Sequence, residues 1–322
     1  MVKGALMSKI VIAGITQFET VIKVDSIPFD MEKQIHDAPV HVGGGGDAMN
    51  EAFALTTLGD KVYFMSVVGQ DQNVEVFNPP DFKVHIDTDY ILPIMKATPS
   101  EIIFFDNNQH QLIFQDLKDI RDAKYDMSMV RPIMAEADCL LVSNANFCRP
   151  FVHYALSAGK KIALNMRSYS KEKEKYNTDF LENSDIIYLS DDTIEGDPYD
   201  FIDDFAKRFD PEIIILGQGK TGLILYDRDR HVKFHYNSVK TNEVVNSLGA
   251  GNALISAFIH YYLETNDSVN AIKNGLLYAS YKTGFMRTCE GFLTPEQVEQ
   301  WRDLIWKTQS VTDIYGVQIP EN

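Results

Sequence analysis

The stretch KIVIAG, residues 9–14, is a short run of apolar, mostly β-branched side chains closed by a glycine. Such a run predicts a buried strand that leads directly into a loop. Strands that alternate with helices predict an α/β fold, with a mostly parallel central sheet flanked by helices on both faces. Runs of the same kind, each after a stretch with helical spacing, recur at residues 62–68 (VYFMSVV), 139–142 (CLLV), 161–164 (KIAL), 185–189 (DIIYL) and 213–216 (IIIL).

Two segments depart from this alternation. Residues 20–24 (TVIKV) and 100–114 read as strands, and residues 106–109 (DNNQ) lie between IIFF and QLIF as a turn would, which favours antiparallel pairing over βαβ units. We expect a small β lid, in residues 18–42 and 90–116, inserted into a single α/β domain that spans residues 9–310. A lid of this kind would cover the ligand crevice at the carboxyl ends of the parallel strands. The alternative is that both segments are edge strands of the main sheet.

Composition and charge exclude several classes of function. The 322 residues are 45% hydrophobic and 24% charged, as in soluble globular proteins. The net charge of −16 repels a phosphate backbone, so nucleic acid is not an expected partner. No apolar run approaches the roughly 18 residues of a membrane span, so no membrane partner is expected. The three cysteines show no C-x-x-C spacing, which argues against disulfides and zinc and predicts a reducing, cytoplasmic setting.

A glycine-rich motif precedes the first predicted helix. Residues 42–51 read VGGGGDAMNE, and the apolar spacing that follows predicts a helix beginning just after the glycines. Glycines in this position allow a ligand to approach the backbone closely, and Asp47 and Asn50 could then contact hydroxyl groups. The alternative is a flexible loop in which Asp47 only caps the helix.

A second glycine motif, NSLGAGN at residues 246–252, opens another predicted helix. The N–H groups of Gly249, Ala250 and Gly251, together with the helix dipole, would form an anion hole for a transferring phosphoryl group. The alternative is a tight turn that serves packing. The nearby GQGKTG at residues 217–222 superficially resembles a P-loop, but LILY at 223–226 continues as a strand, so a strand–turn–strand element is predicted.

Taken together and in this order, these motifs resemble those of the ribokinase-like (PfkB) carbohydrate kinases over about residues 9–299. Gly45 and Gly46, followed by Asn50, resemble the family's GGxxxN sugar loop, and residues 249–251 resemble the centre of its D-T-x-G-A-G-D signature. The resemblance implies a ribokinase-like fold with a sheet of about eight to nine strands and a β lid. It also implies transfer of the ATP γ-phosphate to a sugar hydroxyl, with Mg²⁺ as the metal.

The resemblance implies three groups of site residues. Glu19 stands where the family usually has a substrate-binding aspartate, although a solvent-facing charge is the alternative reading. Arg167 could pair with the carboxylate of an acidic sugar or form a structural salt bridge. The expected sugar-binding residues are Glu19, Gly45, Gly46, Asp47, Asn50 and Arg167; the expected ATP-binding residues are Leu216, Gly217, Gly222 and Ser280; and Asp191 and Asp192 are candidates for Mg²⁺.

The sequence departs from the family where the chemistry takes place. Asn252 occupies the position of the catalytic-base aspartate, and an amide cannot take a proton from a hydroxyl. Residues 190–193 (SDDT) replace the family's N-x-x-E, and Ser280 replaces an asparagine near the nucleotide. The leading hypothesis is therefore an attenuated sugar or polyol kinase. The alternatives are a pseudokinase that binds a sugar or nucleotide without catalysis, and a nucleoside kinase of the same family.

The lid also bears on the oligomeric state. Its strands would expose their edges in a monomer, and exposed edges invite pairing with another chain. The sequence therefore predicts a homodimer formed through the lid.

Overall fold

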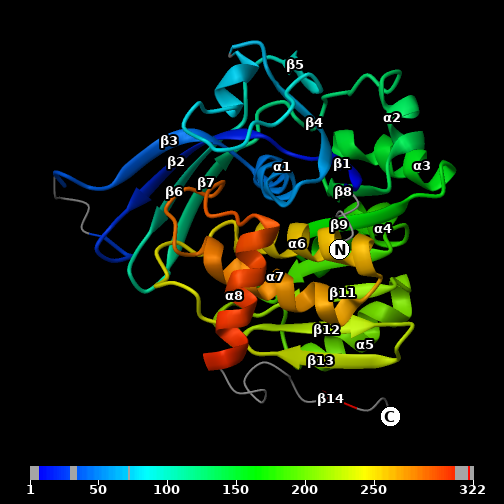
Figure 1. Cartoon of the computed structure of the whole chain (residues 1–322). Coiled ribbons are helices and arrows are strands. Elements are labelled where there is room, and N and C mark those ends of the chain that lie inside the picture. The colour runs from blue at the N-terminus through cyan, green and yellow to red at the C-terminus, as the bar shows by residue number, and fades with distance from the viewer. Residues whose placement is uncertain (1–6, 30–34, 72, 309–317, 320–322) are drawn as a thin grey trace.

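The apolar runs of the sequence lie side by side in a ten-stranded sheet. The computed structural model describes residues 7–29, 35–71, 73–308 and 318–319. Across the sheet the strands follow the order β14-β13-β12-β11-β10-β9-β8-β1-β4-β5 (Figure 1). In chain order they are β1 (Lys9–Ala13), β4 (Lys61–Gly69), β5 (Ile91–Met95), β8 (Cys139–Ser143), β9 (Lys161–Ser168), β10 (Ile186–Ser190), β11 (Ile213–Gly217), β12 (Leu223–Asp227), β13 (Val232–Tyr236) and β14 (Gln318–Ile319).

Pairing within this sheet is parallel from β5 to β11 and antiparallel from β11 to β14. The change occurs at residues 217–222, where β11 turns directly into β12 through a short 3-10 turn. The predicted strand–turn–strand element is therefore confirmed, and GQGKTG is not a P-loop. Among the described residues, no helix is long and apolar enough to span a bilayer.

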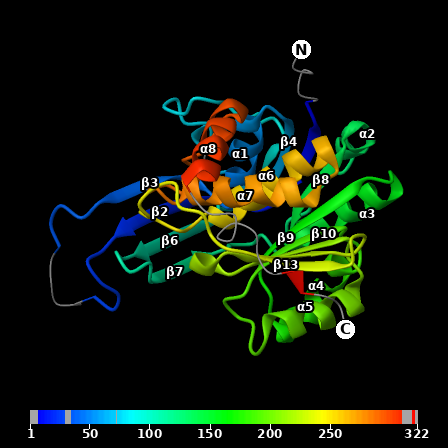
Figure 2. The ribbon, with the colours of Figure 1, turned by 60° about the horizontal axis from the view of Figure 1, so that its bottom comes forward.

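Helices cover both faces of the sheet, as the alternation of strands and helices predicts. Alternate residues of β1 point to opposite faces: Ile10 and Ile12 join one buried cluster, and Val11 and Ala13 join the other. Figure 2 shows the two groups of helices on either side of the sheet. One group is α1 (Asp47–Leu58), α6 (Ala250–Thr265), α7 (Ser268–Lys282) and α8 (Pro295–Thr308), and the other is α2 (Val130–Glu136), α3 (Arg149–Ser157), α4 (Glu174–Leu181) and α5 (Pro198–Phe209).

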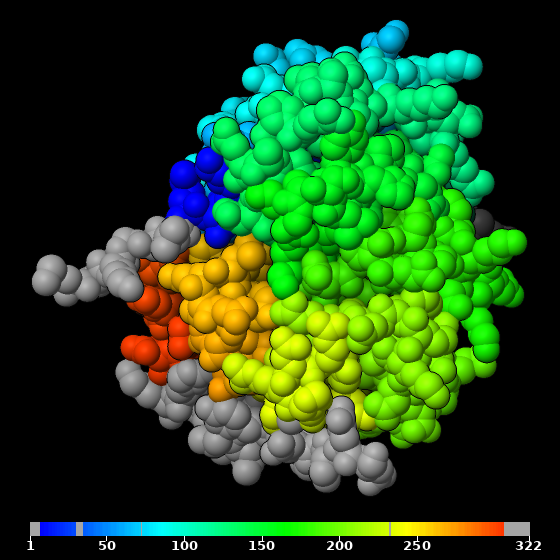
Figure 3. All heavy atoms as spheres, turned by 90° about the vertical axis from the view of Figure 1, so that its right-hand side faces the viewer, coloured from blue at the N-terminus to red at the C-terminus, as the bar shows by residue number. Residues whose placement is uncertain are grey.

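A second sheet projects from one end of the molecule and forms the lid (Figure 1). Its strands are β2 (Gln17–Lys23), β3 (Val40–Gly45), β6 (Ser100–Phe105) and β7 (Gln111–Asp116), in the order β3-β2-β6-β7. The inner face buries Val21, Ile103 and Phe105 against Leu248 and Met286. In the space-filling view, the middle of the chain, in green, lies directly beside the helices toward the C-terminal end, in orange (Figure 3).

The structure corrects three details of the sequence prediction. The predicted lid segment 90–116 starts too early, because β5 pairs with β4 at the edge of the larger sheet, where a proline such as Pro93 is tolerated. The expected antiparallel pairing holds for β2 with β3 and for β6 with β7, whereas β2 pairs with β6 in parallel. The larger sheet has ten strands, not eight to nine. The predicted domain end at residue 310 lies outside the described residues.

Candidate active site

The first glycine motif links the lid to α1. Strand β3 ends at Gly45, and α1 begins at Asp47 after Gly46, whose φ of 95° lies in the region that favours glycine. A Cβ atom on Gly45 would lie 2.1 Å from Cδ of Glu19. The chain therefore needs a glycine at position 45, because the Glu19 carboxyl group occupies the space of any side chain there.

Glu19 is a buried residue of β2 that braces this glycine loop. Its Oε1 accepts hydrogen bonds from the Gly46 N–H group, at 2.7 Å, and from the Gln17 amide, at 3.4 Å. Its Oε2 accepts a hydrogen bond from the Thr288 hydroxyl. Burial raises the pKa of Glu19 above its ordinary value, and these hydrogen bonds partly oppose that shift. The alternative of a solvent-facing charge is wrong, since only 4% of Glu19 is exposed.

A second carboxyl group of the lid, Glu101, lies beside Glu19. Strands β2 and β6 pair Glu19 with Glu101 in register, so both side chains project from the same face of the lid. The Gln17 amide donates to Glu101 Oε2 at 2.7 Å, and the Gln115 amide donates to Oε1 at 3.3 Å. Burial, followed by the nearby charge of Glu19, raises the pKa of Glu101 to about 7.

We expect Glu101 to make the folding stability depend on pH. Its pKa rises from 4.5 in the unfolded chain to about 7 in the folded protein, so the folded state binds more protons between these values. The free energy of unfolding should therefore fall as the pH rises from about 4.5 to 7. The Glu101→Gln protein should lose this slope, with a difference of up to about 3 kcal/mol across the window.

Urea denaturation at several pH values measures this effect. Glu136→Gln is the control, because Glu136 is an exposed carboxylate whose pKa is lowered by Lys9. Curves of unfolding free energy against pH that run parallel for Glu101→Gln and the unchanged chain would contradict the prediction.

The second glycine motif forms the beginning of α6. Gly249 is the cap residue, with φ 79°, and its carbonyl accepts a hydrogen bond from the Ala253 N–H group at 3.0 Å. A Cβ atom on Gly249 would lie 2.7 Å from the Thr288 carbonyl oxygen, and one on Gly251 would lie 2.4 Å from the Tyr188 hydroxyl. The prediction that this motif opens a helix is confirmed. The first N–H groups of a helix lack partners within it, which suits an anion hole made by residues 249–251. Of these three groups, the Ala250 N–H already donates to the Ser247 carbonyl oxygen, at 3.3 Å.

Asn252 lies in the first turn of α6 and joins a row of hydrogen-bonded side chains. The Asn165 amide donates to Asn252 Oδ1 at 2.8 Å and to Glu51 Oε1 at 2.6 Å. The Asn252 amide in turn donates to Asp47 Oδ1 at 3.1 Å. Burial raises the pKa of Glu51 well above its ordinary value. Residue 252 is thus joined directly to the first residue of α1, after the first glycine motif, by the hydrogen bond to Asp47.

Arg167 and Asn50 complete the group of predicted sugar-binding residues. Arg167 has a left-handed backbone, with φ 58°, and its guanidinium lies 3.8 Å from Asp47 Oδ1. Asp47 raises the pKa of Arg167 above its ordinary value. Asn50 Oδ1 is buried and finds no partner in the described part of the chain. A buried amide oxygen without a donor is suited to accept a hydrogen bond from a ligand hydroxyl.

Three of the four predicted ATP-binding residues, Leu216, Gly217 and Gly222, lie at the turn that follows β11. Leu216 and Gly217 end that strand, and a Cβ atom on Gly222 would lie 1.9 Å from the Tyr236 carbonyl oxygen. Ser280 belongs to α7, where its hydroxyl accepts a hydrogen bond from the Thr241 N–H group at 3.1 Å. Only glycine fits at position 222, so this residue shapes the turn.

The two candidate Mg²⁺ ligands follow β10. Asp191 Oδ2 accepts a hydrogen bond from the Gln218 amide at 3.3 Å, and Asp192 Oδ2 accepts one from the Ser190 hydroxyl at 2.9 Å. Within the described ranges, no group of three or more His, Cys, Asp or Glu side chains is assembled to hold a metal ion. A metal here would therefore need additional ligands from phosphate or water.

Sequence reasoning did not assign several polar residues that the structure places in this region. Gln17, Glu51 and Glu101 contact predicted site residues, and the register of the lid strands is the signal that links Glu101 to Glu19. Lys282 is fully buried, and its Nζ donates to the Arg287 carbonyl oxygen at 2.9 Å. Burial lowers the pKa of Lys282 to about 8.

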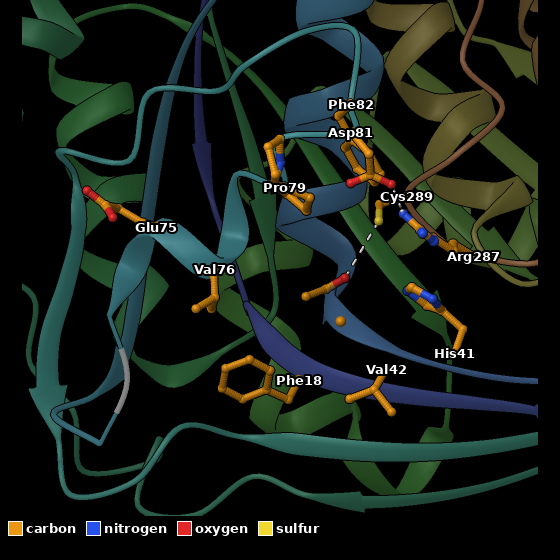
Figure 4. Close-up of a pocket in the computed structure, with 13 residues that line it drawn as sticks. Phe18, His41, Val42, Glu75, Val76, Pro79, Asp81, Phe82, Arg287 and Cys289 are labelled. Carbon is orange, nitrogen blue, oxygen red and sulfur yellow. Dashed lines mark hydrogen bonds and ion pairs between the residues drawn. The ribbon is translucent and has the colours of Figure 1, made fainter.

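A separate cavity of about 350 Å³ lies on the other side of strands β2 and β3 (Figure 4). Phe18 lines it, whereas the neighbouring Glu19 points to the opposite face of the strand. An ion pair between Arg287 and Asp81, with 2.8 Å between Nη1 and Oδ2, closes one side. This cavity was not predicted from the sequence, and it is not formed by the residues around Asn252.

Comparisons with known proteins agree with the fold. The family model described as pfkB family carbohydrate kinase matches residues 7–292. The deoxyribokinase of Salmonella typhi is 25% identical over 303 residues, covering 85% of this chain and 92% of its own. The 5-dehydro-2-deoxygluconokinase of Bacillus subtilis is 24% identical over 281 residues, covering 80% and 85%. The structure of Arabidopsis thaliana ribokinase complexed with ribose and ATP matches with a TM-score of 0.73 and 14% identity, covering 92% of this chain and 98% of that one.

Proposed function

Because the chain belongs to the pfkB family of carbohydrate kinases, we propose that it transfers the γ-phosphoryl group of ATP to a hydroxyl of a sugar or related polyol. The observation that carries this proposal is the hydrogen bond of 3.1 Å between Asn252 and Asp47. It joins the beginning of α6, which suits a phosphoryl group, to the beginning of α1, which suits a sugar. Donor and acceptor would therefore meet between the two glycine motifs.

The sugar would bind between the lid and the beginning of α1. Gly45 and Gly46 let it approach the backbone, while Asn50 offers the unpaired amide oxygen and Arg167 offers a partly exposed guanidinium. Glu19 would act mainly by holding the loop, since both of its carboxylate oxygens already accept hydrogen bonds. Asp47 faces the same region from the first turn of α1.

ATP would bind along the turn after β11, with Leu216, Gly217 and Gly222 shaping the nucleotide site and Ser280 beside it. Asp191 and Asp192 carry the hard oxygen atoms that Mg²⁺ prefers, and their few protein partners suit an ion that takes its other ligands from phosphate and water. Bound Mg²⁺ would neutralise charge on the β- and γ-phosphate oxygens. Gly249, Ala250 and Gly251 would direct N–H groups at the transferring phosphoryl group.

The rate should be reduced by the amide at position 252. General base catalysis typically contributes about 10²- to 10⁴-fold, whereas positioning and charge stabilisation supply the rest in phosphoryl transfer. A chain without a base at this position can therefore remain a slow kinase. We place the reaction in the cytoplasm, because the three cysteines are unpaired and buried.

A second candidate is a non-catalytic protein that binds a sugar or a nucleotide. Both polar atoms of the Asn252 side chain already have hydrogen-bond partners, Asn165 and Asp47, which favours a structural role for this amide. Under this reading the glycine motifs bind ligands but no phosphoryl transfer follows.

ADP release with Mg²⁺ and ATP tests the two candidates on the native chain and on Asn252→Asp. The panel should contain pentoses, hexoses, sugar acids and nucleosides, with deoxyribose and 5-dehydro-2-deoxygluconate included because two relatives are named for them. The expected result is sugar-dependent release by the native chain and faster release by Asn252→Asp. The gain should stay below the roughly 10²- to 10⁴-fold of a full general base, because the carboxylate of Asp47 already lies 3.1 Å from the Asn252 amide. If neither protein releases ADP although both are folded, the kinase function is contradicted. The non-catalytic binding protein would then be the better candidate, and ligand-induced thermal shifts would identify its ligand.

We also propose that two copies of the chain associate through the outer faces of their lids. Strand register aligns Val42, Thr20, Ile102 and Phe114 in one row across this face, and a second row contains Val40 and Leu112. The valines, Ile102, Leu112 and Phe114 are all exposed. An apolar face of this kind, presented by both copies, is typical of an interaction site between identical subunits.

Charged residues in this face should separate the two copies. We expect the native chain to sediment with twice the mass of one chain, and Val42→Lys/Phe114→Lys to sediment as a monomer. Leu156→Lys is the control, since Leu156 is also an exposed apolar residue but lies on α3, outside the lid. Analytical ultracentrifugation makes the comparison, and a dimer that survives the double substitution would place the interface elsewhere.

A further inference from the structure

The side chain at the catalytic-base position cannot accept the proton that a sugar hydroxyl must lose. The carbonyl oxygen of Asn252 accepts a hydrogen bond from Asn165, and its amide group donates to Asp47. The direction of that second bond identifies Asp47 Oδ1 as an acceptor in contact with this position. Asp47 thus brings a carboxylate within 3.1 Å of the amide that replaces the base.

Four carboxyl groups lie around this region, and three of them are poorly placed to take a proton from a ligand. Glu19 uses both oxygens within the glycine loop, and Glu101 uses both on the amides of Gln17 and Gln115. Glu51 has no exposed surface: its Oε1 accepts a hydrogen bond from Asn165, and its Oε2 is buried without a partner among the described residues, so a ligand hydroxyl cannot reach it. Asp47 keeps 17% of its side chain exposed, and both of its side-chain contacts within the described residues, with Asn252 and Arg167, involve Oδ1.

We propose that Asp47 is the catalytic residue that takes the proton in place of residue 252. The proposal rests on the proposed kinase function. In the transfer step the O–H bond of the sugar hydroxyl breaks and its proton moves to Asp47 Oδ2. The hydroxyl oxygen forms a bond to the γ-phosphorus of ATP, and the bond between that phosphorus and the β–γ bridging oxygen breaks. The electron pair of the broken bond stays on the ADP that leaves.

The position of Asp47 in the chain supports this role. It is the first residue of α1, directly after Gly46, so the backbone that holds the sugar loop also fixes the carboxylate. A general base must lie within hydrogen-bond reach of its proton, directly or through one water molecule. The Asp47 carboxylate lies 3.1 Å from the Asn252 amide. A sugar hydroxyl bound next to Asn252 would therefore lie within hydrogen-bond reach of Asp47, directly or through one water molecule.

The test exchanges the two side chains. Four proteins are compared: the native chain, Asp47→Asn, Asn252→Asp and the double variant Asp47→Asn/Asn252→Asp. In the double variant the amide and the carboxylate change places, so the hydrogen bond between the two residues can form in the opposite direction. Asp122→Asn is the control, because Asp122 is an exposed aspartate in the loop before α2. The readouts are kcat for ADP release, KM for the sugar and the melting temperature.

We expect Asp47→Asn to lower kcat about 10²- to 10⁴-fold and to change KM and the melting temperature far less, since the asparagine Oδ1 can still accept the hydrogen bond from the Asn252 amide. The double variant should recover the lost rate, because it again carries one carboxylate at the site. An Asp47→Asn protein that remains as active as the native chain would overturn the role of Asp47 while leaving the kinase intact. Loss of rate that the double variant does not restore would also overturn it. If the native chain releases no ADP with any acceptor, the kinase function and the role of Asp47 are both overturned.

Discussion

The Gly249→Ala protein is expected to release ADP at least about 10²- to 10³-fold more slowly than the native chain, as when one donor to a transferring charge is lost. Gly249 has φ 79°, and its Cβ atom would lie 2.7 Å from the Thr288 carbonyl oxygen and 3.0 Å from Lys282 Cε. The Thr288 backbone cannot easily move away, because the hydroxyl of the same residue holds Glu19. The beginning of α6 must shift instead, and the N–H groups of the proposed anion hole shift with it. The measurement is kcat with the best acceptor of the sugar panel.

A control substitution at Gly159 distinguishes the effect of backbone strain from the effect of displacing the beginning of α6. Gly159 also has a left-handed backbone, with φ 63°, but no atom lies within 4 Å of the position of its Cβ. We expect Gly159→Ala to lose about 1 kcal/mol of stability and to keep its activity, since alanine is strained in this conformation. A Gly249→Ala protein with the same kcat as Gly159→Ala would contradict an anion hole at residues 249–251.

The parallel part of the fold could be predicted because each strand carries its own local signal. Runs such as residues 139–142 are apolar on both faces, which only a sheet covered by helices on both sides can bury. Two of the strands that the sequence did not assign to the larger sheet carry weak signals. Strand β5 contains Pro93 and lies at an edge, and β14 consists of two residues.

The site could be predicted only where its residues are close in the sequence. Both glycine motifs are local, since a few glycines before an apolar helix suffice to indicate them. The partners of Glu19 are not local: Thr288 is 269 residues away, and Glu101 reaches it through the pairing of β2 with β6. Contacts of this kind depend on strand register and on how helices pack, which a single sequence does not specify.

Glu51 illustrates the same limit inside a motif that was recognised. Its place in the first turns of α1 was visible, but nothing local distinguishes a buried glutamate from an exposed one there. The structure buries it completely because Asn165, from β9, provides a hydrogen bond at 2.6 Å. The departure at Asn252 was visible in the sequence, whereas the carboxylate beside it became evident only when α1 and α6 were placed together.

The Gly45→Ala protein is expected to lose about 3 kcal/mol of stability, at the upper end of the usual cost of overpacking. The added Cβ atom would lie 2.1 Å from Glu19 Cδ and 2.3 to 2.4 Å from both carboxylate oxygens. Glu19 cannot withdraw without losing its hydrogen bonds to Gly46 and Thr288. Urea denaturation should show this loss, and the thermal shift caused by the sugar should vanish because the loop is displaced.

If the clash with the Glu19 carboxyl group causes the loss of stability in Gly45→Ala, removing that carboxyl group should reduce the loss. The Glu19→Ala/Gly45→Ala protein should be more stable than the sum of the two single effects predicts, by about 1 to 3 kcal/mol, as for residues in direct contact. Gly43→Ala is the control from the same strand, because its Cβ would meet only the end of the His41 side chain, which can rotate away. Effects of Glu19→Ala and Gly45→Ala that simply add would mean that Gly45 is required for another reason. A positive coupling would identify Glu19 as the brace of the sugar loop, which explains why a buried carboxyl group with a raised pKa is retained there.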